Sequence, residues 1–204
     1  MDFNFDNQFD SQVIGVDEVG KGSWAGPVMA CAALLNYKVS IDKRLDDSKK
    51  LSQKNRKEVL KALIKNNLFG IGEVSNHKID QLGIIRATFL SMEMALNDLR
   101  VKCKNFESTI ILIDGILTPD FIKKKFNTNY KIIKKGDTLS PSIAAASIFA
   151  KCYRDDFMIE MDKKYYGYGF STNMGYGSKK HREKLLLSGP TQLHRMSFNP
   201  MKKL

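Results

Sequence analysis

Five short apolar runs along the chain predict five buried β-strands. They cover about residues 12–17, 27–36, 68–75, 109–113 and 130–135. Runs of this length beside Gly, Pro, Asn or Asp are typical of strands that are buried on both faces. We expect the first two runs to pair with each other, because only a short segment containing Gly and Pro separates them.

Helical patterns lie between and after these runs. The expected helices cover about residues 53–66, 78–101, 119–126, 141–165 and 179–188. Ser52 and Ser140 are placed to cap two of these helices, and Pro119 can begin a short one. The long helix after Ser140 starts with small side chains over 144–147, which would let it approach a sheet closely.

This mixture of strands and helices indicates one layered domain of the α/β or α+β class over residues 1–204. Residues 1–11 are expected to form a flexible arm, with its phenylalanines holding it to the body. From about residue 165 to residue 204 the chain is rich in Gly and Tyr and then irregular, apart from the last helix. The sequence contains no internal repeat and no low-complexity linker.

The net charge of +11, from 33 Lys and Arg against 22 Asp and Glu, favours a polyanionic partner. A general lysine bias of the source organism would produce the same total. The basic residues are however concentrated in two segments, 121–135 and 176–184, and both lie near candidate site residues. This distribution favours nucleic-acid binding over a general bias.

Composition also limits where the chain can work. No apolar run reaches the roughly 18 residues that a membrane span needs, so we expect no membrane association. The acidic, polar N-terminus is unlike a signal peptide. Three widely spaced cysteines argue against disulfides or a zinc site and favour a reducing cytosol. We therefore expect a cytoplasmic protein and, by default, a monomer.

Acidic residues follow three of the predicted strands. Asp17 and Glu18 end the first, Asp114 ends the fourth, and Asp137 comes after the fifth. Acids at strand ends of an open sheet converge on one edge, where carboxylate oxygens can bind hard cations. Gly20-Lys21-Gly22 follows at once and could let backbone N–H groups approach an anion. From these residues alone, an ordinary strand and turn is about as probable as a phosphodiester site.

Six motifs, in order, resemble bacterial ribonuclease HII over about residues 12–198. They are DEVGKG, DSKKLS, IDG, KGD followed by SPSIAAASIFAK, GYGSKKH and LHRMSF. The resemblance implies a ribonuclease H-like fold, with a five-stranded mixed sheet, flanking helices and a helical C-terminal portion. It also implies hydrolysis of the RNA strand of RNA–DNA hybrids and incision beside ribonucleotides embedded in DNA, leaving 3′-hydroxyl and 5′-phosphate ends.

The resemblance also assigns site residues. It puts the metal-binding carboxylates at Asp17, Glu18, Asp114 and Asp137, which would hold two Mg²⁺ or Mn²⁺ ions. It puts recognition of the ribose 2′-hydroxyl at Gly20-Lys21-Gly22, and a tyrosine at the RNA–DNA junction at Tyr176. Lys21 departs from the arginine usual in ribonuclease HII and resembles the sister enzyme ribonuclease HIII, which leaves a hybrid-only specificity open.

Several further residues have both a functional and a structural interpretation. Phosphate contacts are expected from two groups, each of which could instead be a solvated surface: Ser48, Lys49 and Lys50, and Lys179, Lys180 and His181. Asp155 and Asp156 are expected to be structural, salt-bridged beside Lys151 and Arg154. His77 and His194 receive no role, and Trp24 is expected to pack beneath the glycine loop. Two other functions remain open: a non-catalytic nucleic-acid-binding module and a two-metal nuclease that acts only on DNA.

Overall fold

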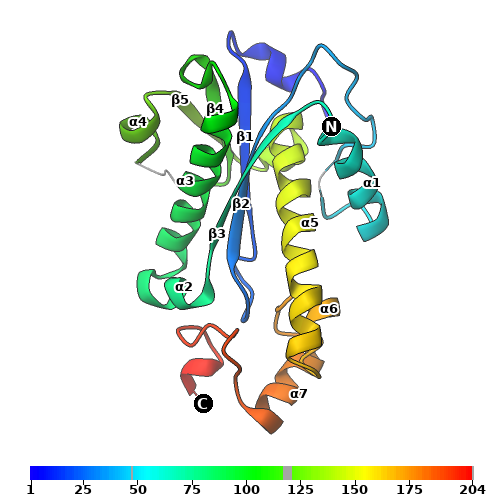
Figure 1. Ribbon diagram of the computed structural model, residues 1–204, viewed down its shortest axis with the longest axis vertical. Helices are drawn as coiled ribbons and strands as arrows, with labels where there is room; N and C mark the ends of the chain where they lie inside the picture. Colours follow the sequence, from blue (N-terminus) through cyan, green and yellow to red (C-terminus); the bar gives the residue numbers. More distant parts are fainter. Residues whose placement is uncertain (47, 117–120, 204) are drawn as a thin grey trace.

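The sheet has five strands in the order β3-β2-β1-β4-β5 (Figure 1). The computed structural model describes residues 1–46, 48–116 and 121–203. The strands are β1 (Val13–Val19), β2 (Val28–Leu34), β3 (Leu68–Val74), β4 (Ile110–Asp114) and β5 (Asn129–Ile133). All five predicted strands are confirmed to within about three residues at each end, an error that is usual for sequence-based boundaries.

The sheet is mixed. β1 pairs with β2, as expected for the first two runs, and β2 with β3, both antiparallel, whereas β4 pairs parallel to both β1 and β5. The parallel ladder aligns Val16 of β1 with Ile113 of β4, so the next residues, Asp17 and Asp114, lie on neighbouring strands at the same level. This register creates the acidic edge that the strand ends predicted.

Helices cover both faces of the sheet. The helices are α1 (Gln53–Leu63), α2 (Asn76–Leu82), α3 (Ile84–Lys102), α4 (Phe121–Phe126), α5 (Pro141–Lys164), α6 (Phe170–Asn173) and α7 (Lys179–Ser188). α3 packs on one face, and α5 with α1 lies on the other (Figure 1). The expected single helix over 78–101 is wrong, because Gly83 with φ of 77° separates α2 from α3. The expected start of the short helix at Pro119 lies outside the described residues.

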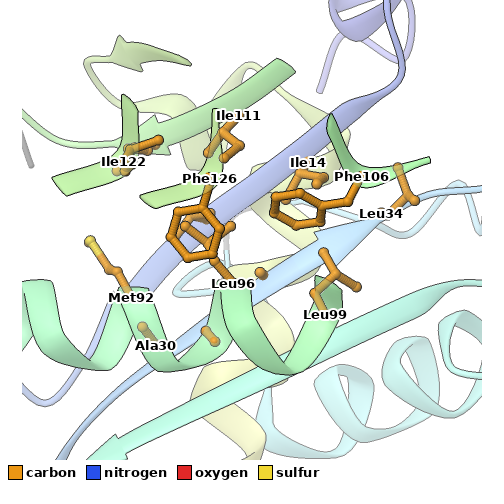
Figure 2. Close-up of a cluster of buried hydrophobic side chains, with 14 of the residues drawn as sticks. Ile14, Ala30, Leu34, Met92, Leu96, Leu99, Phe106, Ile111, Ile122 and Phe126 are labelled. Carbon is orange, nitrogen blue, oxygen red and sulfur yellow. The ribbon is translucent and has the colours of Figure 1, made fainter. Parts of the chain in front are cut away.

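The main hydrophobic core lies between α3 and the sheet (Figure 2). Met92, Leu96 and Leu99 of α3 point at Ile14 of β1 and Ile111 of β4, and all five side chains are almost fully buried. Their spacing along α3 is the three-to-four-residue repeat of an apolar helix face. Ile14 and Val16 of β1 face this core, so the residues between and after them, including Gly15 and Asp17, face α5.

α5 lies unusually close to β1 where it begins. A Cβ added at Gly15 would lie 2.1 Å from the backbone of Ser142, so only glycine fits there. Ala144, Ala145 and Ala146 are fully buried, which confirms that small side chains let this helix approach the sheet. Ser140 caps the helix, with its hydroxyl accepting a hydrogen bond from the N–H of Ile143.

The N-terminal arm is packed onto the body, as expected for its phenylalanines. Residues Phe5–Gln8 form a short 3-10 helix, and Asp6 within it is buried. Its carboxylate accepts hydrogen bonds from the hydroxyls of Tyr37 and Ser140 and from the N–H of Ser142. The aromatic contacts of this arm were predictable, whereas the role of Asp6 was not, because nothing local reveals a partner more than 130 positions away.

The C-terminal portion extends beyond one end of the sheet (Figure 1). α6, α7 and the following tail form a small apolar cluster with the end of α5, including Met158, Phe170 and Leu185. Trp24 joins the same cluster from the loop after β1. The loop after β1 therefore packs partly against C-terminal residues. Among the described residues, no helix is long and apolar enough to cross a membrane.

Candidate active site

Four carboxylates lie at or beside one edge of the sheet. Asp17 and Glu18 belong to the last part of β1, Asp114 ends β4, and Asp137 lies in the 3-10 helix that follows β5. Asp17 and Asp137 are buried, and the other two are half-buried. The prediction that acids from three strands meet at one edge is confirmed for β1 and β4, and Asp137 approaches them from the following turn.

A pocket of about 380 Å³ opens at this edge. Three of the acids line it: Asp17, Glu18 and Asp114. Its other walls are the loop 19–22, Ser48 and Lys49, Ser147 and Lys151 of α5, and Tyr176. Asp137 is not part of the lining, but its carboxylate is joined to the pocket through Lys49, whose Nζ lies 3.2 Å from Asp137 Oδ2.

The acids are held in an environment that opposes their ionisation. Burial raises the pKa of Asp17 well above its usual range, and the nearby charges of Glu18 and Asp114 raise it further. Burial also raises the pKa of Glu18 and of Asp114, with Asp137 adding to the effect on Asp114. Carboxylates that repel one another in a partly dry pocket are a suitable site for cations.

Each carboxylate has a partner in the structure. Lys21 Nζ lies 3.4 Å from Glu18 Oε1, and Lys49 holds Asp137 as described. Asp17 Oδ1 accepts a hydrogen bond from the N–H of Glu18, and Asp114 Oδ1 accepts one from the N–H of Gly136, both at 2.7 Å. Within the described part of the chain, no three acidic, His or Cys side chains converge closely enough to hold a metal ion as they stand.

The donor set nevertheless fits a hard divalent cation. All four groups offer carboxylate oxygens, which Mg²⁺ and Mn²⁺ prefer, and three share one pocket. The ammonium groups of Lys21 and Lys49 lie where positive charge is needed, and both lysine side chains are substantially exposed, at 43% and 79%. Long exposed side chains can swing away, so an incoming cation could replace them without unfolding the site.

The glycine loop faces the acids and Tyr176. Gly20 has φ of 87°, and a Cβ there would lie 2.2 Å from the Arg154 side chain, so this position requires glycine. Gly22 is exposed, and a Cβ at this position would meet only the Tyr176 ring, at 3.8 Å. The open space beside Gly22 therefore lies against the ring of Tyr176, which is 42% exposed.

Relatives of known family match nearly the whole chain. The ribonuclease HII family model matches residues 14–201. Ribonuclease HII of Pelagibacter ubique (strain HTCC1062) is 42% identical over 93% of this chain and 97% of its own. Ribonuclease HII of the Wolbachia of Brugia malayi is 42% identical over 98% of this chain and 94% of its own.

The chain belongs to the ribonuclease HII family. It is thus a ribonuclease H, a metal-dependent endonuclease of RNA–DNA hybrids, and not the non-catalytic binding module considered above. The ribonuclease H-like fold is confirmed by solved structures. Ribonuclease H2 of Pyrococcus horikoshii OT3 aligns with a TM-score of 0.76 and 24% identity, over 94% of this chain and 96% of that one. Bst-RNase HIII in complex with Mn²⁺ aligns with a TM-score of 0.79 and 21% identity, over 98% and 71%.

The residues predicted to contact phosphate differ in their exposure in this ribonuclease HII chain. Ser48 is buried, and its hydroxyl lies 2.9 Å from that of Ser147 at the pocket wall, next to Lys49. Lys179 is exposed on α7, where it can meet a polyanion. The prediction that His181 contacts phosphate is wrong, because its side chain is fully buried and its ring nitrogens are bonded inside the protein.

Two fully buried arginines that the sequence analysis did not select hold the glycine loop. Arg154 donates hydrogen bonds to the carbonyls of Ala25, Pro27 and Met174 and to the Ser23 hydroxyl. Arg195 donates to the carbonyls of Lys21, Gly26 and Pro27. Burial lowers the pKa of Arg195 to about 9. For Arg195, the only sequence signal was its place in the LHRMSF motif.

The expected salt bridges of α5 are present, and one of the two predicted partners, Lys151, takes part. Asp155 pairs with Lys151 and Arg56, and Asp156 pairs with Lys57. Among the described residues Arg154 forms no salt bridge with these acids, because its guanidinium donates to carbonyls and the Ser23 hydroxyl around the glycine loop. These acids are therefore structural, as predicted, and stay apart from the ribonuclease HII pocket.

Proposed function

We propose that this chain hydrolyses the RNA strand of RNA–DNA hybrids and also incises duplex DNA at embedded ribonucleotides, leaving 3′-hydroxyl and 5′-phosphate ends. The observation that carries the proposal is the single pocket in which Asp17, Glu18 and Asp114 face the glycine loop and Tyr176. In this proposal the carboxylates would hold the cations, and the space beside Gly22 and Tyr176 would receive the ribose. In this proposal the chain acts as one domain and as a monomer.

Two Mg²⁺ or Mn²⁺ ions would be held by the four carboxylates. Asp17 and Asp114, on neighbouring strands, are suited to share both ions, and Glu18 and Asp137 would complete one site each. Such a pair of ions supplies an activated water and compensates the charge that builds on the phosphate and the leaving oxygen. Lys21 and Lys49 would release Glu18 and Asp137 on loading and become free to contact substrate phosphates.

Recognition of RNA would depend on the 2′-hydroxyl, which DNA lacks. The backbone at Gly20, Lys21 and Gly22 can approach a ribose because no side chain stands at Gly22. The exposed ring of Tyr176 forms the adjoining wall, next to Gly22, and can stack on a sugar or base. Ser48, Lys49 and Lys179 would contact phosphates on either side of the cleaved bond.

The deciding experiment uses three labelled duplexes: an RNA–DNA hybrid, DNA with one embedded ribonucleotide, and all-DNA. Each is incubated with Mg²⁺, with Mn²⁺ and with a chelator. We expect metal-dependent cleavage of the first two duplexes and none of the third. Asp17→Asn should abolish turnover and leave duplex binding largely intact. Cleavage of all-DNA, or no cleavage of the single-ribonucleotide duplex, would contradict the proposal.

Lys21 supports a second candidate, a specificity for hybrids alone. Lysine presents a point charge where arginine presents a planar fork of donors, so Lys21 is less able to orient an isolated ribonucleotide. Lys21→Arg tests this candidate. If the lysine limits the reaction, the variant should raise incision at a single ribonucleotide several-fold relative to hybrid cleavage. An unchanged ratio would remove Lys21 as the cause of any preference.

A further inference from the structure

Two buried histidines connect the C-terminal tail to Tyr176. His181 lies on α7 and His194 in the tail, and their side chains are 0% and 1% exposed. The Nε2 atoms of the two rings are 3.0 Å apart, which is a hydrogen-bond distance. Neither residue lines the pocket.

The outer partners of the two rings determine where each proton lies. His181 Nδ1 is 2.9 Å from the carbonyl oxygen of Tyr176, which can only accept, so this nitrogen carries a proton. His194 Nδ1 accepts from the backbone N–H of Thr191 at 2.9 Å, so this nitrogen carries none. A neutral His194 therefore has its proton on Nε2 and donates it to the bare Nε2 of His181.

Every bond in this chain is satisfied when both rings are neutral and in opposite tautomers. The donors run in one direction, from the Thr191 N–H through His194 and His181 to the Tyr176 carbonyl. An extra proton on His181 would put two donors face to face at the Nε2 atoms. An extra proton on His194 Nδ1 would face the Thr191 N–H, and it would find an acceptor only if the Thr191 hydroxyl, also 2.9 Å away, turned to receive it. The surroundings also oppose charge, because Trp24, Tyr168 and Phe170 pack against the rings.

We propose that His181 and His194 form a directional hydrogen-bond relay that positions Tyr176 for the substrate. The Tyr176 carbonyl oxygen accepts hydrogen bonds from His181 Nδ1 and, at 2.8 Å, from the Ser178 N–H. The Tyr176 N–H donates a hydrogen bond to the Asn173 carbonyl. With its backbone held at three points, the residue keeps its ring against Gly22. The inference deepens the proposed role of Tyr176 in substrate binding and rests on it.

The relay also explains how the tail reaches the site. Asn76 at the start of α2 donates from its side-chain amide to the carbonyls of Gln192 and His194. The tail is therefore fixed to α2 at His194, the residue whose side chain bonds to His181. Tyr176 is thereby tied to α2 through the tail, in addition to the contacts of its own loop.

The tautomers can be measured without any reaction. Imidazole ¹⁵N chemical shifts of the whole protein should show His181 protonated at Nδ1 and His194 protonated at Nε2 at neutral pH, with both rings uncharged. The same tautomer in both rings, or an imidazolium at neutral pH, would overturn the relay. Because this readout needs no substrate, it is independent of whether the chain cleaves hybrids as proposed.

Kinetics of hybrid cleavage test the positioning role. His181→Phe keeps an aromatic ring but cannot donate, and should raise KM roughly fivefold with little change in kcat, the effect of one lost hydrogen bond. His181→Asn can still donate to the Tyr176 carbonyl and should restore most of the affinity. Leu187→Ala, at an exposed position of the same helix, is the matched control and should leave KM unchanged.

A double-mutant cycle separates positioning from general stability. If His181 acts through Tyr176, then His181→Phe should add almost nothing to KM in a Tyr176→Ala background. An equal factor in both backgrounds would overturn the proposal. Should His181→Phe fail to fold, His194→Asn provides the second test, because its amide oxygen still accepts from Thr191 while the donor to His181 is lost. It should raise KM in the native background only.

Discussion

Asp17 is the residue at which function and stability oppose each other. Its carboxylate is buried, and its neighbours Glu18 and Asp114 carry like charge. Because burial and these charges raise its pKa, the ionised form that would bind metal is disfavoured in the native protein without metal. An acid with a raised native pKa binds protons more readily in the folded state than in the unfolded state. At neutral pH it therefore reduces the free energy of unfolding.

Asp17→Asn should accordingly stabilise the metal-free protein while it abolishes activity. The amide keeps the shape of the side chain and removes the buried charge. We expect the melting temperature in the presence of a chelator to rise by several degrees, since about 1 kcal/mol corresponds to 2–4 °C for a chain of this size. Thermal unfolding followed by circular dichroism measures the change.

Asp156→Asn is the matched control for this substitution. It removes an exposed carboxylate, paired only with Lys57 on the surface, and should alter the melting temperature little. A lower melting temperature for Asp17→Asn than for the native chain would show that the charge repulsion is already compensated in the native pocket.

At the scale of elements, the N-terminus of α5 is held by two separate acceptors. Ser140 supplies the local cap, which the sequence predicted, and Asp6 from the N-terminal arm accepts from the Ser142 N–H and the Ser140 hydroxyl. The start of α5 also touches β1 at Gly15. Fixing this end of the helix therefore fixes the strand that carries Asp17 and Glu18.

Asp6→Ala should destabilise the whole domain and not only the arm. The substitution leaves the buried donors of Ser140 and Ser142, and the hydroxyl of the more exposed Tyr37, without their acceptor, which should lower the free energy of unfolding by about 3 kcal/mol. Urea denaturation measures this change. Asp10→Ala, an exposed position of the same arm, should stay within about 0.5 kcal/mol of the native value. Equal effects of the two substitutions would mean that the arm is dispensable.

At the scale of the whole molecule, two distant groups of side chains respond to pH with opposite sign. Burial lowers the pKa of His194 to about 4, with His181 adding to the effect, so between about pH 6.5 and pH 4 the unfolded chain binds protons that the native ring does not. Stability from this site is lost as the pH falls. The pKa values of Asp17, Glu18 and Asp114 are raised, so stability at the active site increases as the pH falls.

The native protein should therefore lose little stability between neutral pH and about pH 5, because the two contributions partly cancel. Asp17→Asn removes part of the opposing contribution, so its free energy of unfolding should fall more steeply over the same range. Urea unfolding in a chelator at several pH values measures both slopes. Parallel slopes for the two proteins would contradict this account. In the presence of metal, activity should decline on the acid side, where protons compete for the carboxylates.

The elements of the fold were largely predictable because their signals are local. Buried strands need apolar runs and amphipathic helices need a repeat of three to four residues, so all five strands and the long helices were found in the chain. The break at Gly83 was missed because the apolar pattern runs through it, and only the positive φ of the folded chain reveals it. The role of Asp6 in the packed arm was missed because its carboxylate is satisfied entirely by distant donors.

The acids that follow the strands, the glycine loop and the family could all be recognised from the amino-acid sequence, since they depend on residue type and spacing. The folded chain was needed to show which side chains share the pocket, that lysines pair with Glu18 and Asp137, and that His181 faces inward. Those outcomes depend on burial and on contacts between segments far apart in the chain. Arg154, Arg195 and the two histidines belong to this second group, because a polar side chain buried by folding has the same local sequence as an exposed one.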